Sequence, residues 1–155
     1  EAFWVIPGLP MVTTWGAETE ASAVLETGTG PVLILPMGSG EREPDARMLI
    51  DQIHHGRPLV NGPMTPGVSA APAAFSRFGE TPGMAALIAC ERGRPSIQGA
   101  PSFADMRAVG IDVVYLDNGR ARALVVGPDN FERCVRRFLG PPVTEEGPYQ
   151  IYAVP

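Results

Sequence analysis

The sequence predicts a single α/β domain in which a mixed sheet of about four to six strands carries helices on both faces. Two apolar segments, 32–35 (VLIL) and 111–116 (IDVVYL), are typical of buried central strands. Helical patterns alternate with them, as in other proteins of this class. The 155 residues suffice for one core. We therefore expect residues 1–12 to form an extended arm or linker and residues 13–155 to form the domain.

The first half of the chain surrounds the segment 32–35 with helices. A helix is predicted over 17–26, and the two glycines that follow it end it. A second helix is predicted over 44–56, with proline in its first turn and glycine at its end. Arg57 precedes Pro58, which favours extended backbone. A brief strand is therefore expected over 59–62 (LVNG).

Two further helices are predicted before the second apolar segment of the chain. The first covers 83–92 (GMAALIACER), whose small residues allow close packing. The second begins after Ser102, which resembles a capping residue, and Gly110 fits the position after its last turn. Its apolar face is expected to consist of Phe103, Met106 and Val109. It leads directly into the second apolar strand, so helix and strand form half of a β-α-β unit.

The end of the chain is predicted to contain a hairpin, a helix and a closing strand. Asn118-Gly119 after an aspartate is the strongest hairpin signal in the chain, so we expect a turn there and a return strand over 120–126. A helix should begin at Pro128, with its apolar face formed by Phe131, Cys134, Val135 and Phe138. Residues 149–154 alternate like a strand that closes the sheet.

Charge and composition exclude several classes of function. The net charge is −5, the pI is about 5.0, and all 12 basic residues are arginine. This balance predicts no overall electrostatic footprint for a phosphate backbone, so nucleic acid is not an expected partner. The chain contains no apolar run near the ~20 residues that a membrane span requires.

Cys90 and Cys134 are isolated in the sequence, with no CxxC pair. This arrangement excludes a zinc ribbon and a thioredoxin-like motif. Two interpretations stay open at this point: one disulfide, or two buried free thiols on helices.

Three motifs point only weakly to chemistry. Gly38-Ser39-Gly40 lies between a strand and a helix, but it lacks the third glycine of a dinucleotide-binding turn, and acidic residues follow it. Ser69 lies in GVSAA, which lacks the second glycine of a nucleophile elbow. It supports only an alternative interpretation, a free-standing serine hydrolase-like enzyme that uses a histidine.

A metal site is not expected near the two histidines. Asp51, His54 and His55 lie within one helical turn, but only Asp51 and His55 share a face. Two ligands do not make a metal site. We therefore expect neither a metal nor another cofactor, and the residues do not identify a catalytic group.

A denser polar cluster lies where the second helix leads into extended backbone. It consists of Gln52, His55, Arg57 and Asn61. Arginine offers a planar fork to carboxylate or phosphate, and amides offer paired donors and acceptors that also suit sugar hydroxyls. We predict these four residues as a ligand-binding site. The other interpretation is a buried network that fixes the corner between helix and strand.

The same region resembles a known family. The matching segments are 30–36 (GPVLILP), Arg47-Met48 with Gln52, and 55–62 (HGRPLVNG); the match continues in 108–115 (AVGIDVVY) and 149–152 (YQIY). Together they resemble the extracytoplasmic C-terminal domain of bacterial polytopic membrane proteins similar to protein mannosyltransferases. The segment 52–62 is its most distinctive part.

The resemblance implies a soluble domain on the extracytoplasmic side of the cell membrane. The parent protein would use a polyprenyl-phosphate-linked sugar, with its catalytic acid on a loop between transmembrane helices. This chain would contribute acceptor binding or structural support through Gln52, His55, Arg57 and Asn61. Its expected partners are the transmembrane bundle and a sugar or polyprenyl-phosphate-linked substrate. A non-catalytic interaction module is the remaining alternative to this function.

Overall fold

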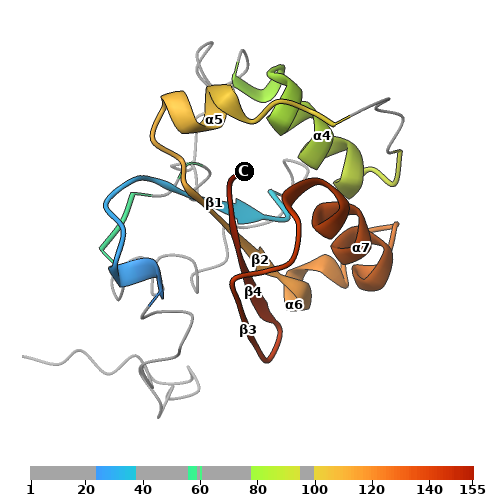
Figure 1. Cartoon of the computed structure of the whole chain (residues 1–155). Coiled ribbons are helices and arrows are strands. Elements are labelled where there is room, and N and C mark those ends of the chain that lie inside the picture. The colour runs from blue at the N-terminus through green and yellow to red at the C-terminus, as the bar shows by residue number, and fades with distance from the viewer. Residues whose placement is uncertain (1–23, 38–55, 59, 61–77, 95–99) are drawn as a thin grey trace, which may run out of the picture.

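The computed structural model describes residues 24–37, 56–58, 60, 78–94 and 100–155. Its sheet contains β1 (Val32–Leu35), β2 (Val113–Asp117), β3 (Thr144–Glu146) and β4 (Tyr149–Ala153). The strand order is β1-β2-β4-β3, with β1 parallel to β2 and the other two pairs antiparallel. Figure 1 shows this sheet with helices packed around it. The predicted α/β domain with a mixed sheet is confirmed.

The strands β1 and β2 are the two apolar segments that the sequence predicts. Every residue of β1 is buried, and its register with β2 runs from Val32 opposite Val113 to Leu35 opposite Leu116. On the other edge of β1, the Val32 N–H donates to Pro58 O at 2.8 Å. The Val60 N–H donates to Val32 O at 2.9 Å. Hydrogen bonds to residues 58 and 60 from the two sides of one residue are typical of parallel strands. Residues 58 and 60 therefore border β1 here, and the rest of the strand predicted over 59–62 lies outside the described residues.

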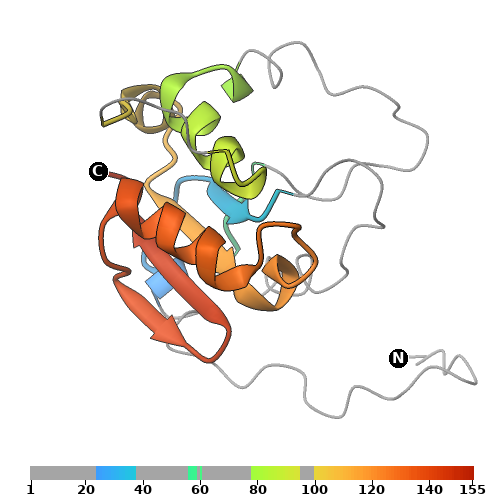
Figure 2. The same cartoon turned by 90° about the vertical axis from the view of Figure 1, so that its right-hand side faces the viewer.

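Within the described ranges, four helices pack against one face of the sheet. They are α4 (Pro82–Glu91), α5 (Ala104–Ala108), α6 (Asn118–Ala121) and α7 (Pro128–Leu139). Figure 2 shows α4 and α7 side by side across this face. The core between helices and sheet contains residues from each of them, including Leu33, Leu87, Met106, Leu116, Ala121, Phe131, Val135 and Tyr152. The predicted apolar face of α7 is thus the face that it buries.

A second, smaller core covers the other face of the sheet. Residues 24–26 are helical, which confirms the end of the predicted helix over 17–26. Leu25 from this turn packs with Val32, Ile34 and Ile151. Beside them, the rings of Tyr115 and Tyr149 stack with their centroids 5.5 Å apart. Helices thus pack on both faces, as predicted.

The end of α5 leads the chain directly into β2. Gly110 has φ +84° and donates to Arg107 O at 2.9 Å, while the Ile111 N–H donates to Met106 O at 3.0 Å. This pair of bonds is a Schellman ending, which needs a left-handed residue and so favours glycine. The prediction for Val109 was wrong, because its side chain is 56% exposed. It lies just beyond the short helix, whose core contact is Met106.

The hairpin predicted at Asn118-Gly119 is not formed. These residues begin α6 instead, and the Asp117 carboxylate caps that helix by accepting the Arg120 N–H at 3.1 Å. Segment 120–126 is helix and turn, so the predicted return strand there is also wrong. A return strand has no edge to join, because β1 and β4 already occupy the two sides of β2.

The hairpin of the structure lies later in the chain, between β3 and β4. Gly147, with φ +56°, and Pro148 connect the two strands. Strand β3 was not predicted, because its residues Thr144–Glu146 have no apolar pattern. Its Glu145 instead forms an ion pair with Arg136 of α7.

Some predicted elements lie outside the described residues. They are the arm over 1–12 and the body of the helix over 44–56. The glycine predicted to end that helix, Gly56, has φ +66°, a conformation that favours glycine.

Candidate functional site

Of the four predicted ligand-binding residues, the structure describes Arg57. Its side chain is only 2% exposed. The guanidinium Nε donates to Gly30 O at 2.7 Å, and Nη1 donates to Leu25 O at 3.4 Å. Nη2 forms an ion pair with the carboxylate of Asp112. One buried side chain thus joins the end of the helical turn 24–26, the approach to β1 and the approach to β2.

Gly28 provides the space that the guanidinium occupies. A Cβ atom at this position would lie 2.7 Å from Cζ of Arg57, and even closer to Nη1. Real Cβ atoms do not approach this closely, so a larger residue would displace the guanidinium. Gly28, which ends the helix predicted over 17–26, therefore also leaves room for the Arg57 guanidinium.

Arg57 lies at the amino ends of the parallel strands. Gly30 comes two residues before β1, and Asp112 comes directly before β2. In open α/β sheets, ligands bind beyond the carboxyl ends of the strands, at the opposite edge. Each guanidinium nitrogen of Arg57 bonds to a group of the protein, as expected for a buried residue of a structural network.

The other three predicted residues, Gln52, His55 and Asn61, lie outside the described residues. Their joint binding of a ligand with Arg57 stays a prediction. Ser69, the Gly38-Ser39-Gly40 turn and the Asp51, His54 and His55 group also lie outside. Within the described ranges, no group of three or more His, Cys, Asp or Glu side chains is placed to hold a metal ion.

A second polar site lies at the carboxyl end of β1. The carboxylate of Glu91, the last residue of α4, accepts the backbone N–H of Met37. Burial raises the pKa of Glu91 above its ordinary value, and the Met37 N–H and the nearby Arg120 and Arg92 guanidinium groups partly offset this. Carboxyl groups with raised pKa values occur at functional sites as well as in structural networks.

Glu91 is not among the residues predicted from the sequence, and the sequence signal for it is faint. In the sequence it is only an acidic residue at the end of an apolar helix. Its importance depends on Met37, which is 54 positions away. At the same edge, Asn118 Nδ2 donates to Glu132 Oε2 at 3.0 Å, whereas the buried Asn118 Oδ1 has no hydrogen-bond partner among the described residues.

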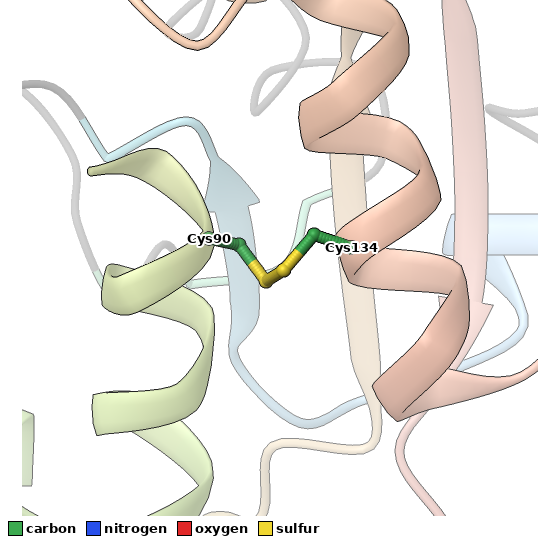
Figure 3. The surroundings of a disulfide bond; sticks show 2 residues. All are labelled: Cys90 and Cys134. Carbon is green, nitrogen blue, oxygen red and sulfur yellow. A yellow bond between two sulfur atoms is a disulfide. The ribbon is translucent and has the colours of Figure 1, made fainter. Parts of the chain in front are cut away.

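A disulfide joins Cys90 of α4 to Cys134 of α7 (Figure 3). The two Cα atoms are 5.6 Å apart, within the usual range for such a bond. The bond spans a sequence separation of 44 residues and joins two of the helices that pack on one face of the sheet. Of the two interpretations that the sequence leaves open, the structure has the disulfide.

Comparison with known proteins does not identify a family for this chain. Within the described part of the chain, no helix combines the length and the apolar character needed to cross a membrane. The chain matches no protein-family model, no curated protein and no solved structure.

Proposed function

We propose that this chain is an extracytoplasmic domain of a glycosyltransferase-like polytopic membrane protein. In this role it braces the transmembrane bundle or binds the acceptor, and the catalytic acid lies elsewhere in the parent protein. The sequence resemblance over 52–62 (QIHHGRPLVNG) suggests this function.

The observation that carries the proposal is the disulfide between Cys90 and Cys134. Disulfides form and persist in secreted, periplasmic and cell-surface proteins, and they are rare in the reducing cytosol. Cys90 is fully buried, so its pairing is part of the core. A disulfide that ties two core helices fits a domain that folds outside the cytoplasm.

The contacts of Arg57 fit a structural role inside the domain more than a direct contact with substrate. Each of its three guanidinium nitrogens bonds to the protein, and the side chain is buried at the amino ends of β1 and β2. In this role, Arg57 helps to hold the described residues 56–58 and 60 beside β1. The side chains of Gln52, His55 and Asn61 then provide the proposed contacts to a sugar or to a polyprenyl-phosphate-linked substrate.

Reporter fusions test the proposed location. Alkaline phosphatase and green fluorescent protein are each fused after Pro155 of the complete reading frame in a bacterial host. Alkaline phosphatase is active only outside the cytoplasm, so we expect high phosphatase activity and no fluorescence. Bright fluorescence with an inactive phosphatase would contradict the proposal, as would a reading frame without hydrophobic spans.

A titration separates acceptor binding from bracing. A water-soluble polyprenyl-phosphate analogue is added to this chain and to its His55→Ala and Asn61→Ala variants, with intrinsic fluorescence as the signal. Binding that weakens at least about tenfold in both variants would favour a ligand site, because each loses a polar contact. If the wild-type chain gives no signal, bracing is the favoured role.

A further inference from the structure

Exposed arginines and a valine lie together where α4 ends and α7 begins. Arg92 and Arg94 follow α4 and are exposed, and Val125, in the loop between α6 and α7, is fully exposed. The two segments are in contact, because a Cβ atom at Gly93 would lie 3.2 Å from Cγ2 of Val126. The exposed Arg122 lies in the same loop as Val125.

A short chain of hydrogen bonds adds a fourth arginine to this surface. Asn130 of α7 donates from Nδ2 to Val126 O at 3.1 Å. Arg133 in turn donates from Nη1 to Asn130 Oδ1 at 2.9 Å, which holds its guanidinium toward the loop. We call this set, Arg92, Arg94, Arg122, Val125 and Arg133, the arginine-valine surface.

The carboxylates near this surface mostly bond to groups inside the protein. Glu91 accepts the Met37 N–H, and Asp117 accepts the Arg120 N–H. Glu132 accepts from Asn118 and forms an ion pair with Arg136. Among the described residues, the exposed carboxylate beside the surface is that of Asp129. In this part of the chain, four exposed arginines thus face one exposed acid, although the whole chain has a net charge of −5.

We propose that the arginine-valine surface docks on an anionic lipid bilayer. This inference rests on the proposed function, which places the domain beside a membrane. Guanidinium groups bind phosphate with paired hydrogen bonds, and basic residues near an anionic bilayer each add to the attraction. An exposed aliphatic side chain such as Val125 gains by entering the boundary between headgroups and acyl chains. The surface combines both features in one loop and the helix end beside it.

The shape of the molecule suits such an orientation. Figures 1 and 2 both show the α6–α7 loop at one end of the described structure and α5 at the other. Two exposed residues of the α5 segment, Arg107 and Val109, repeat the chemistry of the surface at that far end. They provide matched controls for the charge and for the apolar side chain.

Vesicle flotation tests this inference with the 155-residue chain. The vesicles are phosphatidylcholine alone, or phosphatidylcholine with about one third phosphatidylglycerol. We expect at least about tenfold tighter binding to the anionic vesicles, and binding that weakens as salt screens the charges. Arg122→Glu should weaken binding at least about fivefold, because one arginine near such a surface contributes about that factor. Val125→Asp should weaken it by a similar factor.

The controls decide whether the effect belongs to this surface. Arg107→Glu and Val109→Asp should leave binding within about twofold of the wild type. Equal binding to both kinds of vesicle, or equal losses in the control variants, would overturn the inference. Because the assay uses this chain alone, failed flotation would remove the docking surface but not the location that the reporter fusions test.

Discussion

Arg57 and Asp112 form an ion pair between a side chain that is 2% exposed and one that is 57% exposed. The carboxylate therefore keeps much of its hydration, whereas the guanidinium depends on protein groups for its hydrogen bonds. Two of those groups are backbone carbonyls, at Gly30 and Leu25. The pair thus resembles a buried cation held by backbone, with a solvated counter-ion at its rim.

This asymmetry predicts unequal effects of removing the two partners. Arg57→Ala should lower the free energy of unfolding by about 2–4 kcal/mol, because it leaves buried carbonyls unpaired and empties the site. Asp112→Asn should lower it by about 1 kcal/mol or less, as exposed ion pairs contribute little. Urea unfolding followed by circular dichroism measures both values. Equal effects of the two substitutions would show that the backbone contacts are unimportant.

The space at Gly28 gives a second prediction. Gly28→Ala should lower the free energy of unfolding by about 1–3 kcal/mol, because the new methyl group overlaps the Arg57 guanidinium. Gly79→Ala is the matched control, since the nearest atom to a Cβ there is 3.8 Å away. The control should change the free energy by less than about 1 kcal/mol. If Gly28→Ala is as stable as the control, the guanidinium does not occupy this space in solution.

The disulfide should contribute strongly to stability. A double Cys90→Ala and Cys134→Ala variant should lose about 4 kcal/mol, because the cross-link restricts a loop that spans 44 positions in the unfolded chain. Adding a reducing agent to the wild type should move its urea midpoint toward that of the variant. A midpoint that is unchanged by reductant, with both thiols free at the start, would mean that the bond is absent.

The raised pKa of Glu91 predicts that the stability of the fold changes with pH. Its pKa is raised in the folded state, so the folded chain holds this proton more tightly than the unfolded chain. The stability that the protonated Glu91 carboxyl contributes to the fold is therefore fully present below its ordinary pKa of 4.5. This stability is lost as the pH rises through the higher pKa of the folded state. Glu91→Gln keeps an acceptor for the Met37 N–H without this loss.

The variant Glu91→Gln should therefore gain stability relative to the wild type as pH rises from about 4 to about 7. Glu80→Gln is a suitable control, because Glu80 is exposed. Urea unfolding at the two pH values measures the difference. If the variant becomes less stable than the wild type toward neutral pH, the charged carboxylate is favoured in the fold.

Burial leaves patterns in the sequence, and those patterns predicted much of the fold. The apolar segments that form β1 and β2 are buried on both faces, and α7 buries the face that its periodicity indicates. Gly110 marked the end of α5, because a left-handed position favours glycine. In each case the physical cause acts within a few residues of the signal.

Signals that depend on distant partners were missed or misread. An Asp-Asn-Gly sequence can form a hairpin or cap a helix, and the choice at Asp117 depends on β4 already occupying the edge of β2. The partners of Arg57 include Asp112, which is 55 positions away. The pairing of Cys90 with Cys134 likewise depends on how α4 packs against α7.

The oxidation state of Cys90 and Cys134 in living cells tests the proposed extracytoplasmic role most directly. Cells that express the complete reading frame are quenched with acid and treated with a maleimide reagent that adds mass to free thiols. Mass spectrometry then reads the peptides that contain these two cysteines. We predict a linked pair of peptides that takes up the reagent only after reduction. Two separately labelled, unlinked cysteines would contradict the proposal.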